Sequence, residues 1–327
     1  MDRPDLSVVI PVYKCDECLN HLHERLVAAL EGAAISFDLV FVDDGSPDSS
    51  WSTLLELARR DPRVKLVRLS RNFGQHAAIT AGLEYASGEW IAVMDCDLQD
   101  PPEQLPILYC KAQEGFEVVL ARRVGAGHSF PRRAGSALYF RVLNALLGTT
   151  FDVGFGNFSV ISHKVRNEFL RVRDKDRHYL MILQWLGFKT TSVDFPYASR
   201  YAGESSYTFG MLLRFAFDGL FFQTTTLLRW IIYLGFAVSG FGAILALYFF
   251  VNYFVGNTYP GWTSLGVLIL LLGGFIIVST GVTGLYVGKI FVQAKDRPLY
   301  VVDRVVEAPT LVTDGMVKAS GVLAADD

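Results

Sequence analysis

A run of 58 residues without any charged side chain is the feature that most limits how this chain can fold. No Asp, Glu, Lys or Arg occurs from Ile231 to Gly288, whereas one membrane-spanning helix needs only about 20 apolar residues. A stretch with proline and glycine at 255–263 divides the run, and such residues break helices and form turns. The run therefore predicts two membrane-spanning helices, Leu228–Phe254 and Ser264–Gly288, joined by a tight turn.

Basic residues flank the predicted hairpin, and its turn contains none. Arg214 and Arg229 precede the hairpin, and Lys289, Lys295 and Arg297 follow it. Because segments rich in Lys and Arg stay on the cytoplasmic side, both ends of the chain are expected in the cytoplasm. No apolar leader precedes the first predicted strand, so nothing is expected to export the N-terminal part. These patterns predict a multi-pass protein of the plasma (inner) membrane.

The composition argues against several other classes of protein. Charged residues make up 19% of the 327 residues, below the roughly 25% of typical soluble domains. A net charge of −3 gives no reason to expect a nucleic-acid partner, which needs a basic face. Four cysteines are too few for a disulfide scaffold. The lone pair Cys15 and Cys18 is therefore expected to serve ordinary packing.

The first 200 residues or so show short apolar strands that alternate with helices. The predicted strands are Leu6–Val12, Leu39–Val42, Val64–Leu69 and Trp90–Met94. The helical segments between them contain Leu19, Leu22, Leu26 and Leu30 in the first, residues 51–59 in the second and residues 76–86 in the third. This alternation predicts an α/β domain with a mainly parallel sheet.

Four carboxylates follow two of the predicted strands. Asp43 and Asp44 come after the second strand, and Asp95 and Asp97 come after the fourth. Because ligands of parallel sheets bind beyond the carboxyl ends of the strands, we expect these groups at one edge. Two carboxylates one residue apart can share Mg²⁺ or Mn²⁺, with substrate phosphates completing the ligand shell. The sequence thus predicts a metal site of Asp95 and Asp97, to which Gln99 adds a neutral oxygen.

Four short motifs resemble those of family-2 glycosyltransferases of the GT-A fold. They are Val9-Ile-Pro-Val-Tyr13, Asp43-Asp-Gly-Ser46, Ser70-Arg-Asn-Phe-Gly74 and Asp95-Cys-Asp-Leu-Gln-Asp-Pro-Pro-Glu103. With Arg200-Tyr-Ala-Gly-Glu-Ser-Ser-Tyr207 and the apolar hairpin, the chain resembles the polyisoprenyl-phosphate glycosyltransferases over residues 6–302. That group includes dolichyl-phosphate mannose synthases.

Three further segments look closest to the bacterial undecaprenyl-phosphate formamidoarabinose transferase branch. They are Asn72-Phe-Gly-Gln-His-Ala-Ala-Ile-Thr-Ala-Gly82, Thr224-Thr-Thr226 and Gly284-Leu-Tyr-Val-Gly-Lys-Ile290. The resemblance implies inverting transfer of a sugar from a nucleotide-diphosphate donor, UDP-linked by the branch resemblance, to a polyisoprenyl (undecaprenyl) phosphate. It places this step at the cytoplasmic membrane face, where it makes a lipid-linked sugar for cell-envelope glycan modification.

Two alternatives stay open at this point. One is transfer from GDP-mannose, as in dolichyl-phosphate mannose synthases. The other is a processive membrane polysaccharide synthase, although such an enzyme should have more spans. The expected partners are the nucleotide-sugar donor, the polyisoprenyl phosphate and the lipid bilayer. The identity of the sugar, the choice between Mg²⁺ and Mn²⁺ and the presence of a homo-oligomer are left open.

The resemblance also implies roles for individual residues. Pro11, Tyr13 and Asp43 would line the nucleotide pocket, and Asp95 would contact the donor while it binds the metal. Arg123 matches an arginine that binds the acceptor phosphate, and Arg122 is the adjacent alternative. The further candidates for substrate binding are Arg132, Arg133, Arg200 and Ser205. The residues expected to act in catalysis are Asp97, Arg123 and Arg200.

Asn157 stands where the family has an aspartate. An amide cannot act as a general base. Either no base is required, because the acceptor phosphate is already ionised, or Asp152 supplies it; we favour the first reading.

The expected organisation has four parts. A GT-A glycosyltransferase domain covers 1–207, and an amphipathic juxtamembrane helix covers 208–226. Two transmembrane helices cover 227–290, and a cytoplasmic C-terminal tail covers 291–327.

Overall fold

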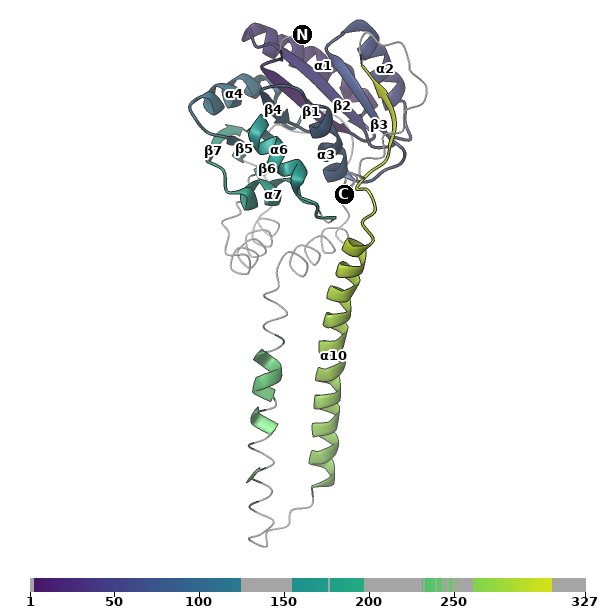
Figure 1. Ribbon diagram of the computed structural model, residues 1–327, viewed down its shortest axis with the longest axis vertical. Helices are drawn as coiled ribbons and strands as arrows, with labels where there is room; N and C mark the ends of the chain where they lie inside the picture. The colour runs from purple at the N-terminus through teal and green to yellow at the C-terminus, as the bar shows by residue number, and fades with distance from the viewer. Residues whose placement is uncertain are drawn as a thin grey trace, which may run out of the picture. The chain divides into compact units, whose positions relative to one another are not determined.

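The computed structural model describes residues 3–124, 155–175, 177–196 and 261–307, with a few helical residues between 231 and 251. The chain divides into two compact units. One unit contains an eight-stranded sheet with its helices, and the other contains the long helix α10 (Trp262–Ala294) (Figure 1).

The strands and helices predicted for the first hundred residues are all present. In chain order they are β1 (Leu6–Val12), α1 (Asp16–Gly32), β2 (Phe37–Asp43), α2 (Ser50–Arg60), β3 (Val64–Leu69), α3 (Gln75–Tyr85) and β4 (Trp90–Val93). The elements that follow are η1 (Pro102–Gln104), α4 (Leu105–Gln113), β5 (Val118–Val124), β6 (Phe155–Ser162), α6 (His163–Arg171), α7 (Tyr179–Leu186), β7 (Thr190–Pro196), α10 and β8 (Val302–Val306).

The sheet is mixed and mainly parallel, as predicted. Its strand order is β7-β5-β6-β4-β1-β2-β3-β8. β1 is parallel to β2 and β4, and β2 is parallel to β3. Only β6 and β8 run against their neighbours. The carboxyl ends of the parallel strands therefore meet at one edge of the sheet, together with the start of β6.

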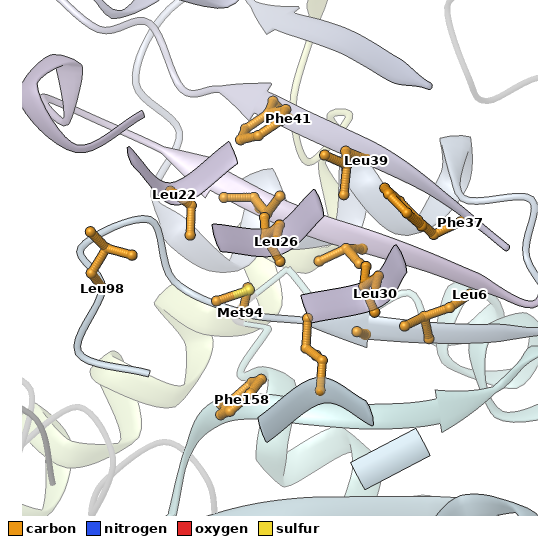
Figure 2. Packing of buried hydrophobic residues seen from close by; sticks show 14 of the residues in the cluster. Leu6, Leu22, Leu26, Leu30, Phe37, Leu39, Phe41, Met94, Leu98 and Phe158 are labelled. Carbon is orange, nitrogen blue, oxygen red and sulfur yellow. The ribbon is translucent and has the colours of Figure 1, made fainter. Parts of the chain in front are cut away.

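Two hydrophobic clusters lie on opposite faces of the sheet. One joins alternate residues of β1 to α1, α2 and α4, and the other joins the strands to α3, α6 and α7. Figure 2 shows Leu22, Leu26 and Leu30 of α1 in a row below Phe41, Leu39 and Phe37 of β2 in the first cluster. These three α1 leucines are fully buried, and burial of each stabilises the fold by roughly 1.5–3 kcal/mol.

Helix α10 agrees with the second predicted membrane span. Its segment Leu272–Ala294 has 23 residues, or about 35 Å at a rise of about 1.5 Å per residue, against a hydrocarbon core of about 30 Å. Within the part of the chain that the structure describes, α10 is the one helix long and apolar enough to cross a membrane. Around the first predicted span only a shorter apolar helix, Tyr233–Gly242, is described. The two-helix hairpin is therefore not confirmed.

The structure adds a strand where the sequence analysis expects only a tail. β8 follows α10 and pairs antiparallel with β3, with Leu66 opposite Val306. The segment before it is also attached, because Ser70 N–H donates to the Val301 carbonyl at 2.9 Å and Tyr300 is buried. Residues 297–306 therefore belong to the unit that contains the sheet.

Candidate active site

The predicted carboxylates lie at the edge of the sheet where the parallel strands end. β1 and β2 end in register at Val12 and Asp43, and β4 ends two residues before Asp95. Asn157, near the start of the antiparallel β6, lies at the same edge. We call the group of carboxylates at this edge the acidic rim; it consists of Asp43, Asp44, Asp95, Asp97 and Asp100.

Asp95 is a strongly perturbed carboxylate of the acidic rim. Its Oδ1 accepts a hydrogen bond of 2.6 Å from Nε2 of Gln75, and the Asn157 side chain also bonds to it. Burial, followed by the charges of Asp100 and Asp97, raises the pKa of Asp95 to about 7, although Arg123 and Asn157 act in the opposite direction. Burial and neighbouring negative charge make the ionised form of Asp95 costly, and a bound cation would relieve this cost.

The loop that follows β4 holds Asp97, the second predicted metal ligand, in a tight turn. Asp97 Oδ1 accepts the backbone N–H of Gln99 at 3.2 Å, a turn in which an aspartate bonds to the backbone two residues later. Between them, Leu98 has a φ of +60° and is buried. A leucine rarely adopts this left-handed conformation, so its packing in the core holds the loop in place.

Arg123 forms a buried ion pair with a carboxylate that the sequence analysis did not assign. Nε and Nη2 of Arg123 both donate to Asp100 Oδ1, at 3.0 and 2.7 Å. Burial raises the pKa of Asp100, and the positive charge of Arg123 offsets part of this rise. Burial alone would lower the pKa of Arg123, but the Asp100 carboxylate outweighs it and the pKa is raised. The guanidinium lies on Gly156, where an added Cβ would approach Nη2 to 3.2 Å.

Arg122 lies away from the acidic rim. Arg122 makes hydrogen bonds to both oxygens of Asp194, a carboxylate of β7 outside the acidic rim, at 2.6 and 2.7 Å. Both side chains are exposed. The structure therefore brings Arg123, and not Arg122, to the carboxylates.

The residues expected at the nucleotide lie on β1 and β2. Pro11 is buried, and Tyr13 is 43% exposed just after β1. Asp43 is fully buried; its Oδ1 accepts the Ser46 N–H at 3.1 Å and its Oδ2 lies 3.3 Å from Arg68 Nε. Burial raises the pKa of Asp43. Within the described residues, Asp43 Oδ2 has no hydrogen-bond partner.

Four expected substrate-binding residues and the expected surface helix lie outside the described residues. They are Arg132, Arg133, Arg200, Ser205 and the segment 208–226; Asp152 also lies outside.

The donor set of the acidic rim fits a hard divalent cation. In the described ranges, no three Asp, Glu, His or Cys side chains are placed to hold an ion by themselves. Mg²⁺ and Mn²⁺ are nevertheless commonly held by one or two carboxylates, with substrate phosphates as further ligands. Asp95 and Asp97 supply such oxygens, and among the described residues the buried Asp100 Oδ2 has no hydrogen-bond partner. These oxygens suit a hard cation better than a soft one.

Two residues of this site, Asp100 and Gln75, were missed by sequence reasoning. A signal existed for each, since Asp100 is the third carboxylate of the Asp95–Glu103 motif and Gln75 belongs to the Asn72–Gly82 segment. Spacing alone did not show that Asp100 turns inward to Arg123 or that Gln75 reaches Asp95.

The cysteine pair packs in the core, as expected. Cys15 and Cys18 are buried in the cluster around α1. The Cys15 thiol donates to the Cys96 carbonyl at 3.1 Å, and this contact together with burial raises the pKa of Cys15. A neutral, buried thiol is a packing group rather than a nucleophile.

The sequence also matches proteins of a known family. The profile of glycosyl transferase family 2 matches residues 7–170. The uncharacterized glycosyltransferase YkcC of Bacillus subtilis is 36% identical over 300 residues, covering 91% of this chain and 93% of that protein. The prophage bactoprenol glucosyl transferase homolog of Escherichia coli K12 is 31% identical over 302 residues, covering 92% and 99%. The undecaprenyl-phosphate 4-deoxy-4-formamido-L-arabinose transferase of Salmonella paratyphi A is 33% identical over 313 residues, covering 92% and 93%. The chain therefore belongs to glycosyl transferase family 2.

Proposed function

We propose that this enzyme transfers a sugar, with inversion, from a UDP-sugar to a polyisoprenyl phosphate at the cytoplasmic face of the membrane. The observation that carries the proposal is the acidic rim with Arg123 beside it, because carboxylates for a cation and an arginine for a phosphate meet at one edge. Relatives named for bactoprenol and for undecaprenyl phosphate support the choice of acceptor.

The nucleotide would bind at the ends of β1 and β2. Asp43 carries a buried oxygen without a hydrogen-bond partner among the described residues, so an N–H of the base or an O–H of the ribose can supply the missing donor. Exposed Tyr13 and Pro11, two residues before it, would form the wall of this pocket.

The donor diphosphate would lie against Asp95 and Asp97. These carboxylates, with Gln99, would hold Mg²⁺ or Mn²⁺. When bound, the cation supplies positive charge that stabilises the departing nucleotide diphosphate. The turn at Asp97 and the buried Leu98 fix the loop that carries these ligands, so little reorganisation is needed when the donor arrives.

The acceptor phosphate would approach Arg123. A guanidinium has five N–H groups, so the two nitrogens bound to Asp100 leave donors for a phosphate. A phosphate is already largely ionised near neutral pH, so its oxygen can attack without a general base. The amide of Asn157, which bonds to Asp95, is compatible with this mechanism. Arg132, Arg133, Arg200 and Ser205 are proposed as further contacts to the substrates.

The membrane part of the proposal rests on α10 and its flanks. α10 is apolar and long enough to span a bilayer, and Lys295 and Arg297 follow it. Basic flanks favour the cytoplasmic side, so we place both termini and the sheet there. The enzyme would then make a lipid-linked sugar for the cell envelope.

The test uses the purified full chain in detergent with undecaprenyl phosphate, Mg²⁺ or Mn²⁺ and a panel of donors. UDP-glucose comes first, because the Escherichia coli K12 relative is named as a bactoprenol glucosyl transferase homolog; GDP-mannose is included. We expect a lipid-linked sugar from at least one UDP-sugar. If no donor is used, or if only GDP-mannose is used, the proposal is wrong.

Asp97→Asn should abolish most of this activity. The change keeps the size of the side chain but removes the charge that would hold the cation, so kcat/KM should fall about 100-fold or more. Glu24→Gln, an equivalent change at an exposed position on α1, should leave kcat/KM unaltered. Equal activities for the two variants would contradict the role given to Asp97.

A further inference from the structure

Gln75 is a polar residue beside the acidic rim, and neither the family resemblance nor the relatives assign a role to it. It is the first residue of α3, and its Nε2 lies 2.6 Å from Asp95 Oδ1. Gln75 and Asp95 come from different sides of β1. In the strand order β4 lies on one side of β1 and β3 lies on the other; Asp95 follows β4, whereas α3, which begins with Gln75, follows β3. The contact therefore joins two loops that are distant in the sheet.

The loop before Gln75 is anchored by Asp44. The two carboxylate oxygens of Asp44 accept the backbone N–H groups of Phe73 at 2.7 Å and Gly74 at 2.9 Å. Gly45 lets the backbone at Arg71 pass close to it. Its φ is +65°, and a Cβ added at this position would lie 2.6 Å from the Arg71 carbonyl carbon. Gly74, with a φ of +97°, then turns the chain into α3. Gln75 is thus delivered to Asp95 by an ordered turn.

Among the residues that the structure describes, the groups that bond to Asp95 are neutral. Gln75 and Asn157 contribute amides, whereas the nearby cation Arg123 bonds to Asp100 instead. An amide donor fixes the orientation of a carboxylate without cancelling its charge. A guanidinium in the same place would orient Asp95 but would compete with a metal ion for that charge.

We propose that Gln75 is a positioning residue for the divalent cation: its amide holds one oxygen of Asp95, so that the other oxygen is presented to the ion. This inference rests on the cation that the proposed function places at Asp95 and Asp97. Gln75 does not contact the sugar or the acceptor in this arrangement. It acts through Asp95, in the way that hydrogen-bonded partners of metal ligands orient those ligands in metalloproteins.

The test measures metal binding rather than turnover. The purified full chain in detergent is titrated with Mn²⁺ in the presence of UDP, and free Mn²⁺ is followed by electron paramagnetic resonance. Gln75→Met, which keeps the length of the side chain but removes the donor, should weaken Mn²⁺ binding about 10- to 100-fold. Gln113→Met, at an exposed position that ends α4, should bind Mn²⁺ like the wild type.

Two further measurements separate positioning from other roles. The affinity for UDP without metal and the thermal unfolding midpoint should both be unchanged in Gln75→Met. Unaltered Mn²⁺ binding in this variant would overturn the inference. An equal loss of metal-free UDP binding, or a large fall in the unfolding midpoint, would also overturn it, because Gln75 would then serve the nucleotide or the fold.

The outcomes also distinguish this inference from the proposed function. If the wild type binds no Mn²⁺ with UDP, the metal site and the role of Gln75 both fail. If Gln75→Met loses Mn²⁺ affinity but the wild type makes no lipid-linked sugar, the role of Gln75 stands and the proposed acceptor is wrong.

Discussion

Two adjacent arginines of β5 lie in opposite electrostatic surroundings. Arg123 bonds to Asp100, whose side chain is fully buried, whereas Arg122 bonds to Asp194 at the exposed surface. A buried charge that loses its partner cannot be solvated, so breaking such a pair is costly. An exposed pair is solvated whether it is formed or not, and contributes little.

We therefore expect Arg123→Met to destabilise the fold far more than Arg122→Met. Loss of Arg123 leaves Asp100 buried without its cation, which costs about 3–5 kcal/mol in the free energy of unfolding. Denaturant unfolding of the full chain in detergent measures both variants. The double variant Arg123→Met/Asp100→Asn should recover part of the loss. Similar stabilities for the two single variants would show that the ion pair is not buried in solution.

The family resemblance favoured Arg123 and kept Arg122 as the adjacent alternative, because residue type alone does not choose between two neighbouring arginines. The choice depends on which face of β5 each side chain occupies, and a register shift between Leu120 and Arg122 makes simple alternation unreliable there. The same reasoning explains Asp100. A motif with several carboxylates does not show which of them turns into the core. For Asp100 the inward orientation depends on its partner Arg123, which lies on β5.

At the scale of elements, α3 and α7 begin side by side through a pair of histidines. The rings of His76 and His178 lie 4.5 Å apart, and the Tyr179 N–H donates to His76 Nδ1 at 3.4 Å. Burial, and then the proximity of His178, lowers the pKa of His76 to about 3. Burial also lowers the pKa of His178. Both rings are therefore neutral in the folded protein at neutral pH.

This histidine pair should make the fold less stable in mild acid. The folded-state pKa of His76 lies below the unfolded value of about 6.5, so the unfolded chain binds the proton first. The contribution to stability is complete above pH 6.5 and is lost as the pH falls towards 3; from pH 6.5 to 5 the loss is up to about 2 kcal/mol.

The measurement is the unfolding midpoint at pH 7.5, 6 and 5, for the wild type and His76→Gln. The glutamine variant should lose less stability between pH 7.5 and 5, because it has no ring to protonate at this position. Parallel pH profiles for the two proteins would contradict the assignment.

Helix and strand periodicity predicted some elements better than others. α1 was predicted because Leu19, Leu22, Leu26 and Leu30 repeat at helical spacing and all face the core. β8 was not predicted, because it has five residues and its Asp303, Arg304 and Val305 are exposed at the edge of the sheet. Its position depends on hydrogen bonds to β3, which no local pattern of side chains reveals.

At the scale of the whole molecule, the placement of the sheet on the cytoplasmic side can be tested with Cys110. This cysteine of α4 is exposed, whereas Cys15 and Cys18 are buried. A membrane-impermeant maleimide should therefore label the protein in inverted membrane vesicles and leave it unlabelled in intact spheroplasts. Because Cys96 is half-buried, Cys110→Ser should remove most of the labelling. Labelling in intact spheroplasts that disappears in the serine variant would place the sheet outside.

The return of the chain from α10 to the edge of the sheet has a consequence for how the protein is made. A ribosome completes residues 262–294 before it reaches residues 302–306, so β3 keeps an open edge until the long apolar helix has been synthesised. Open strand edges invite pairing with other chains. The nascent protein therefore closes its last strand only after translation has passed α10, and a chain terminated before that point leaves the edge of β3 uncovered.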